Sequence, residues 1–223
     1  MLPAGKRTSL DLLTGIRRSP MRNMMRRIAC TASLSSLAMI LAAVFSTAAF
    51  AHVGDHSHMG FAQGFAHPFT GIDHMLAMVA VGLWASQIGG RALWLLPLTF
   101  PVAMAAGAAL GFGSVTLPGV EVGITVSVLV LGAAVALTYR PSLAVSLPLI
   151  VLFAVMHGYA HGAELPASAS ALTYCAGFIV STLGLHLTGI ATGLLATSAP
   201  VRFVVRGAGG AIAATGLVLL VTV

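Results

Sequence analysis

Six long apolar segments, separated by short polar connections, occupy the chain from residue 71 to its end. A helix needs about 20 predominantly apolar residues to cross the hydrocarbon core of a bilayer, and each segment is close to that length. The pattern therefore predicts an all-α integral membrane protein, built as a six-helix transmembrane bundle. The predicted spans are residues 71–88, 92–112, 120–138, 143–159, 168–196 and 203–223.

An earlier apolar segment, residues 28–50, has the features of a secretory signal peptide. Arg22, Arg26 and Arg27 precede it, and Ala49-Phe50-Ala51 at its end fits the small-residue pattern of a cleavage site. The segment is longer than a usual signal core, so an uncleaved first transmembrane helix is the alternative. We expect three parts: an N-terminal extension with the signal peptide in residues 1–51, a flexible His-rich periplasmic tail in residues 52–66, and the six-span transmembrane domain in residues 67–223.

The composition agrees with a membrane protein, because 58% of the residues are hydrophobic and only 7% are charged. Soluble domains carry about 25% charged residues. The formal net charge of +6 could suggest a nucleic-acid binder, but seven of the 11 Lys and Arg residues lie in the first 27 residues, inside the predicted targeting segment. From His52 onward, four Arg balance two Asp and two Glu. We therefore exclude nucleic acid as a partner and expect the lipid bilayer instead.

The remaining positive charges predict how the chain is oriented. Arg91, Arg140, Arg202 and Arg206 all belong to the first, third and fifth connections, whereas the second and fourth contain no Lys or Arg. Cytoplasmic loops carry the excess of Lys and Arg, so these connections are predicted to be cytoplasmic. We expect a multi-pass protein of the bacterial inner membrane, with the mature N-terminus and the C-terminus in the periplasm.

The first polar group in an apolar region is formed by His67, Asp73 and His74. Ionisable residues in a membrane segment are costly and usually functional. Proline is favoured at the first position of a helix, so we expect the helix to start at Pro68 and His67 to lie just outside it. In a straight helix His67 and His74 would be about 10 Å apart, too far to bind one ion. Breaks at Pro68 and Gly71 would have to bring them together.

A second polar group, formed by His157, His161 and Glu164, ends the fourth predicted span. The spacings of four and three residues place all three on one helical face. The predicted topology puts both groups at the same outer side. Cys30 lies inside the predicted signal and Cys175 has no partner, so no disulfide or thiolate site is available. Imidazole with carboxylate suits Ni²⁺, Co²⁺ or Zn²⁺ better than Ca²⁺ or Mg²⁺.

Other histidines are auxiliary candidates for metal binding. The predicted tail contains His52, Asp55, His56 and His58, which could bind a metal weakly. His186, inside the fifth predicted span, is either an inner relay ligand or a histidine satisfied by a neighbouring helix. Gly107 with Gly111, and Gly189 with Gly193, have the GxxxG spacing that allows two helices to approach closely. We interpret these glycines as packing positions.

Two motifs resemble the signatures of the HupE/UreJ family of nickel/cobalt permeases. The first is His67-x5-Asp73-His74, followed by Ala77-Met78-x2-Val81-Gly82-x2-Ala85. The second is His157-Gly158-x-Ala160-His161-Gly162-x-Glu164, and it is preceded by Met156 where the family often has an aromatic residue. Gly177-Phe178 and Leu185-His186 are also similar to the family.

The resemblance implies uptake of Ni²⁺, or of Co²⁺, to supply the maturation of hydrogenase or urease. The transported ion is then the substrate, bound by His67, Asp73, His74, His157, His161 and Glu164, and no cofactor or catalytic residue is expected. No GxxxxGK[ST] loop for ATP is present, so a secondary permease or facilitator is predicted rather than an enzyme.

Two other classes of protein remain as alternatives. Paired membrane histidines also serve as bis-histidine haem ligands in redox proteins. The same outer ligands could instead belong to a membrane-anchored periplasmic metal sensor or chaperone. The sequence leaves open whether the protein forms a homo-oligomer.

Overall fold

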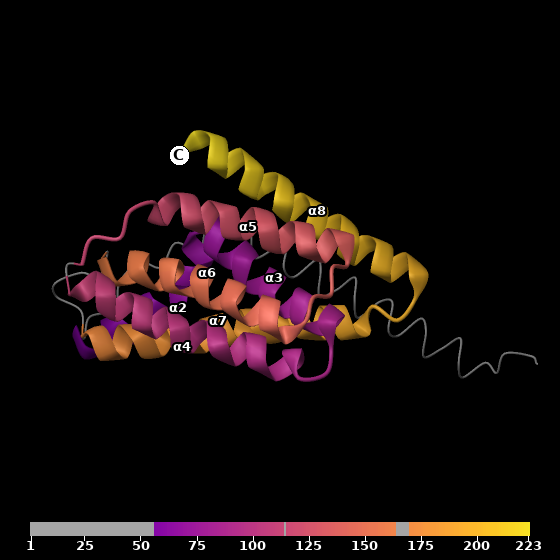
Figure 1. The fold of residues 1–223 in the computed structure, drawn as a ribbon. Helices are drawn as coiled ribbons and strands as arrows, with labels where there is room; N and C mark the ends of the chain where they lie inside the picture. The colour runs from indigo at the N-terminus through magenta and orange to yellow at the C-terminus, as the bar shows by residue number, and fades with distance from the viewer. Residues whose placement is uncertain (1–55, 114, 164–169) are drawn as a thin grey trace, which may run out of the picture.

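The computed structural model describes residues 56–113, 115–163 and 170–223, with the backbone alone for residues 56–59. The predicted signal peptide, Cys30, His52, Asp55 and Glu164 lie outside these described residues. Regular structure in the described part is helical, and the elements follow one another along the chain as drawn in Figure 1. They are α2 (His56–Thr70), α3 (Ile72–Ile88), α4 (Ala92–Phe112), α5 (Val120–Leu137), α6 (Leu143–Ala163), α7 (Ala171–Leu195) and α8 (Ala199–Thr222).

The helices agree closely with the predicted spans. Five of them, α4 to α8, are long and apolar enough to cross a membrane, and a sixth crossing is added if α2 and α3 together form one broken span. Most predicted ends lie within about four residues of the observed ones, as is usual where helix ends fray. The all-α, multi-pass membrane class is therefore confirmed, with five or six spans.

The expectation for the segment before α3 was wrong in two respects. Residues 56–66 are the first part of α2, not a flexible tail. Pro68 lies inside α2 near its end, whereas α3 begins at Ile72 with Gly71 as its N-cap. The axis turns by 82° between the two helices. The polar composition of this segment did not indicate a helix, because the helix is stabilised by packing along α7.

Helix α3 lies at the centre of the bundle and is buried on nearly every side. Eleven of its residues are buried, and it packs along α7, with α5 and α4 on its other sides. Around it, α4 packs along α6 and α5 packs along α8, an arrangement visible in Figure 1. A helix that is apolar all round belongs in such an interior position.

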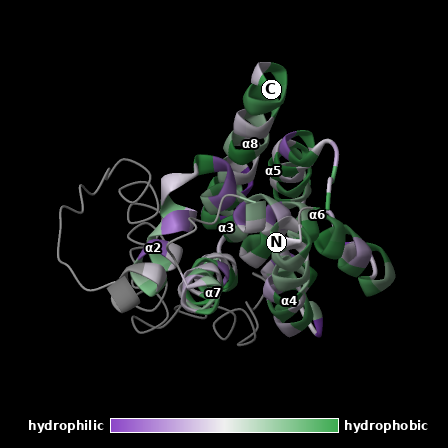
Figure 2. Cartoon of the chain, turned by 90° about the vertical axis from the view of Figure 1, so that its left-hand side faces the viewer, coloured by the Kyte–Doolittle hydropathy of each residue, from purple (hydrophilic) through white to green (hydrophobic). Residues whose placement is uncertain are grey.

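The outer surface of the bundle is apolar, as a membrane protein requires. Figure 2 shows that hydrophobic residues predominate in the outer helices α5, α6 and α8. Trp94, Val102, Leu172 and Phe203 are large apolar side chains that remain 68–82% exposed. Such residues would be unfavourable in water but suit contact with lipid.

All four described arginines lie at one end of the bundle, where α3, α5 and α7 end and α4, α6 and α8 begin. Polar groups at this end tie the helix termini together. Trp84 donates to the carbonyl of Tyr139 (2.7 Å), Gln87 to that of Val135 (3.0 Å) and Arg206 to that of Ala136 (2.8 Å). The two ends of the bundle therefore differ chemically.

The predicted packing role of the GxxxG glycines is confirmed. A Cβ added at Gly107 would meet the backbone of Val155 in α6, and one at Gly189 would meet the backbone of α3 at Val79 and Leu83. These glycines allow α4 to approach α6, and α7 to approach α3, at backbone contact.

Candidate metal centre

The bend at Gly71 brings together the two histidines of the first motif. His67 lies in the last turn of α2 and His74 in the first turn of α3, and their ring centroids are 6.2 Å apart. A straight helix would have separated them by about 10 Å along its axis. The expectation that a chain break joins them is correct, although the break is at Gly71 and not at Pro68.

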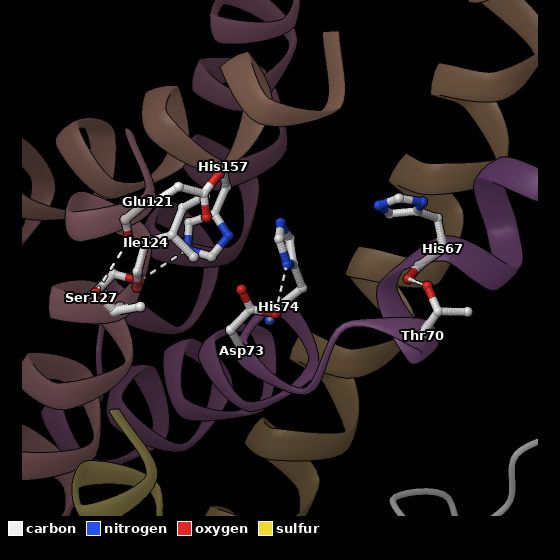
Figure 3. A network of polar contacts seen from close by, with 9 residues as sticks. His67, Thr70, Asp73, His74, Glu121, Ile124, Ser127 and His157 are labelled. Atoms are coloured by element: carbon white, nitrogen blue, oxygen red, sulfur yellow. Dashed lines mark hydrogen bonds and ion pairs between the residues drawn. The ribbon is translucent and has the colours of Figure 1, made fainter. Parts of the chain in front are cut away.

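The second motif meets the first at the same place. The ring centroid of His74 lies 4.7 Å from that of His157 and 4.5 Å from that of His161, and His67 lies 4.6 Å from His161. We call His67, His74, His157 and His161 the histidine cluster. Its members come from α2, α3 and α6, and Figure 3 shows His74 standing between His157 and His67. The predicted meeting of two distant motifs at one end of the bundle is confirmed for their histidines, while Glu164 stays a prediction.

Asp73 holds His74 in one orientation and in one tautomer. Its Oδ1 accepts hydrogen bonds from the backbone N–H of His74 (2.8 Å) and from His74 Nδ1 (2.9 Å). A carboxylate can only accept, so Nδ1 carries the proton and, in neutral His74, Nε2 keeps a free lone pair. Carboxylates orient metal-binding histidines in this way in many metalloproteins. Asp73 therefore acts through His74 here.

Ser127 in α5 does the same for His157, and sequence reasoning missed it. The Ser127 hydroxyl donates to the carbonyl of Ile124 (2.6 Å), so its oxygen is left to accept from His157 Nε2 (2.8 Å). The other ring nitrogen of His157, Nδ1, then has the free lone pair. A serine in an apolar helix gives no signal of such a role, because serines commonly bond to their own helix, as Ser127 also does.

The free nitrogens of the cluster are buried and unsatisfied. His74 Nε2, His157 Nδ1 and both ring nitrogens of His161 have no hydrogen-bond partner among the described residues. Burying such groups costs free energy unless a partner is supplied. In the described part of the chain, however, no group of three or more His, Cys, Asp or Glu is arranged so that it could already hold a metal ion. Binding one ion would require the rings to rotate from their present edge contacts.

Aromatic side chains enclose the cluster on two sides. The ring of Phe178 in α7 lies 4.0 Å from His161, and the ring of Phe100 in α4 lies 5.8 Å from His157. Phe178 belongs to the Gly177-Phe178 pair that resembles the family, whereas the residue type and position of Phe100 give no signal of such a role. These rings exclude water from the inner side of the cluster and strengthen electrostatic interactions within it.

Of the other candidate residues, His186 is the one whose side chain the structure describes, and it lies apart from this cluster. His186 is fully buried in α7, and its ring contacts Phe100 (5.4 Å). His56 and His58 lie in the first turn of α2, where the backbone alone is described. Glu164, His52 and Asp55 remain predictions, since they lie outside the described residues.

Comparison with known proteins places this chain in a family. The family described as "HupE / UreJ protein" matches residues 39–219. "Protein HupE" of Rhizobium leguminosarum bv. viciae is 42% identical over 191 residues, which covers 86% of this chain and 96% of the relative. No solved structure matches this chain.

Proposed function

The chain belongs to the HupE/UreJ family, and from that premise we propose that it is a permease or facilitator for uptake of a divalent transition-metal ion. Ni²⁺ is the first choice of substrate and Co²⁺ the second. The imported ion would supply the maturation of hydrogenase or urease. The protein would act as a transporter in the bacterial inner membrane, not as an enzyme.

The observation that carries this proposal is the histidine cluster itself. Four imidazoles from three helices pack together at the end of the bundle opposite the four described arginines. By the positive-inside rule, the cluster then lies on the periplasmic side. A cation arriving from outside would meet imidazoles before it met any fixed positive charge.

The donors available suit the proposed ion. His74 Nε2 and His157 Nδ1 keep their lone pairs through the hydrogen bonds to Asp73 and Ser127. The ring of His161 contacts that of His74 and also that of His67. Neutral imidazoles are good ligands for Ni²⁺, Co²⁺ and Zn²⁺. We assign Asp73 an orienting role and propose Glu164 as a charged ligand.

The geometry disfavours the haem alternative. The rings of His74, His157 and His161 touch, with centroids 4.5–4.7 Å apart, which leaves no space for a porphyrin between them. A sensor or chaperone would bind the ion but would not carry it across the membrane.

The direct test is uptake of radioactive ⁶³Ni²⁺ by nickel-starved cells that express the protein, with Co²⁺, Zn²⁺ and Cu²⁺ as competitors. We expect saturable uptake above that of cells without the protein, with Co²⁺ as the strongest competitor. Binding of Ni²⁺ to the purified protein without uptake would instead support the sensor or chaperone function. Absence of both Ni²⁺ binding and Ni²⁺ uptake would overturn the proposal.

Replacing Ser127 by alanine is expected to weaken Ni²⁺ binding without preventing folding. Loss of the hydroxyl frees His157 to rotate and to change tautomer, and loss of such an outer partner typically costs about 10–100-fold in metal affinity. The affinity is measured by equilibrium dialysis of the purified protein. S127T, which keeps the hydroxyl, should restore binding. S146A is the matched control, because Ser146 is equally buried but its hydroxyl bonds to the carbonyl of Ser142, just before its own helix. Equal affinities for S127A and S146A would contradict the role of Ser127.

The proposed orientation predicts that Val223 faces the periplasm. Alkaline phosphatase, which is active only there, should be active when fused after Val223, and a fluorescent protein that requires the cytoplasm should not. A second fusion after Arg140 should give the opposite pattern, because this connection carries a positive charge. Phosphatase activity after Arg140 but not after Val223 would invert the bundle and place the histidine cluster inside the cell.

A further inference from the structure

A second polar position lies deeper in the bundle, at His186 in α7. Its side chain is 0% exposed, and neither ring nitrogen is in hydrogen-bond geometry with any described residue. A histidine that served only packing would be expected to pair with a neighbouring helix, because an unsatisfied buried polar group costs about 1–3 kcal/mol.

Thr182, one turn earlier on the same face of α7, is also unsatisfied. It is 0% exposed and its hydroxyl has no partner among the described residues. The other serine and threonine hydroxyls of α7 bond to a carbonyl of the preceding turn: Thr173, Ser181, Thr188 and Thr192. Thr182 is the exception, and it is four residues from His186, a spacing that places two side chains next to each other.

A third polar group near His186 comes from α4. Pro101 has no N–H, so the carbonyl oxygen of Pro97, four residues earlier, receives no helical hydrogen bond from it. That carbonyl lies near the imidazole of His186, outside the geometry of a regular hydrogen bond. Two helices therefore supply an imidazole, a hydroxyl and a carbonyl oxygen, all without their usual partners.

Phe100 connects this position with the histidine cluster. Its ring centroid lies 5.8 Å from that of His157 and 5.4 Å from that of His186. Four rings in successive contact therefore form a row that begins in the first turn of α3 and leads into the interior of the bundle. They are the rings of His74, His157, Phe100 and His186. One aromatic ring separates the two sets of donors.

We propose that His186, the Thr182 hydroxyl and the Pro97 carbonyl form an inner site that holds the divalent cation in transit, reached from the histidine cluster past Phe100. This inference rests on the proposed function. The inner site has only neutral donors among the described residues, whereas the histidine cluster has the carboxylate of Asp73 hydrogen-bonded to His74. Conduction requires binding that is strong enough for the ion to enter and weak enough for it to leave, and a neutral inner site meets the second requirement.

Uptake kinetics test the role of the inner site. Initial rates of ⁶³Ni²⁺ uptake, normalised to protein in the membrane, are measured over a range of Ni²⁺ concentrations for H186L, T182V and the control S181A. We expect the maximal rate to fall about tenfold or more in H186L, and less in T182V, with little change in the half-saturating concentration, because the outer cluster is intact. S181A should equal the wild type, since the Ser181 hydroxyl is already bonded within α7. Wild-type kinetics in both H186L and T182V would overturn the inner site.

A spectroscopic test shows directly whether an ion reaches this position. His186→Cys is introduced into a background with Cys30→Ala and Cys175→Ala, and the purified protein is titrated with Co²⁺. A thiolate bound to Co²⁺ gives an intense near-ultraviolet band, which we expect for H186C. Leu187→Cys is the control, because Leu187 is at the same depth but 58% exposed on the lipid side. No band, or equal bands in the two variants, would overturn the proposal.

The two tests separate this inference from the proposed function. If the wild type takes up no Ni²⁺, the proposed function fails, whatever the Co²⁺ spectra show. If the wild type transports Ni²⁺ while H186L and T182V behave like S181A and H186C gives no band, only the inner site is wrong.

Discussion

His74→Ala is expected to reduce Ni²⁺ uptake to the background of cells that lack the protein. His74 is the member of the histidine cluster that touches all three others, at 4.5, 4.7 and 6.2 Å. It also presents a free, buried Nε2. Removing it deletes one ligand and separates the His157 side of the cluster from the His67 side. Uptake of ⁶³Ni²⁺ at low and at saturating concentration measures the effect.

Asp73→Asn should have a smaller effect than His74→Ala at saturating Ni²⁺. An asparagine can still contact His74 but no longer requires the proton to be on Nδ1, so the loss should appear as a Ni²⁺ affinity lowered about 10–100-fold.

Met75→Ala is the matched control for His74→Ala, because Met75 is the next buried residue of α3 and has no role in the cluster. If H74A retained more uptake than M75A at equal protein levels, the cluster could not be the binding site.

Gly158→Ala is expected to destabilise the protein and to abolish uptake. A Cβ at Gly158 would meet the backbone of α4 at Met104, and backbone atoms cannot move away as a flexible side chain can. Overpacking of this kind typically costs about 1–3 kcal/mol, and here it would also push α6, with His157 and His161, away from α4. The thermal stability of the purified protein and ⁶³Ni²⁺ uptake measure the two effects.

Gly210→Ala in α8 provides the matched control for this glycine. Nothing lies within 4 Å of a Cβ added there, so the substitution should be neutral or stabilising, as expected for Gly to Ala in a helix interior. Equal melting temperatures for G158A and G210A would show that α4 and α6 do not require the close approach seen in the structure.

The sequence alone determined the class of protein, the approximate spans and the family. Crossing a bilayer demands helices of a certain length and hydrophobicity, and both can be counted along the chain. It also determined that the two motifs lie at the same end, because each crossing reverses the direction of the chain. His74 lies in the first turn of a helix and His161 in the last turn of one that runs the opposite way, so their placement at the same end followed from the order of the helices.

The tertiary structure alone decided how the site is built. Hydropathy contains no information on the rotation of a helix that is apolar all round, since both lipid and protein interior favour apolar residues. The partners Ser127, Phe100 and Phe178 depend on that rotation and could not be assigned from their residue types. The bend at Gly71 and helix α2 also depend on packing against α7, a helix about a hundred residues further along. A long-range contact, from Ser127, therefore sets the tautomer of His157. The tautomer of His74 is instead set by its chain neighbour Asp73.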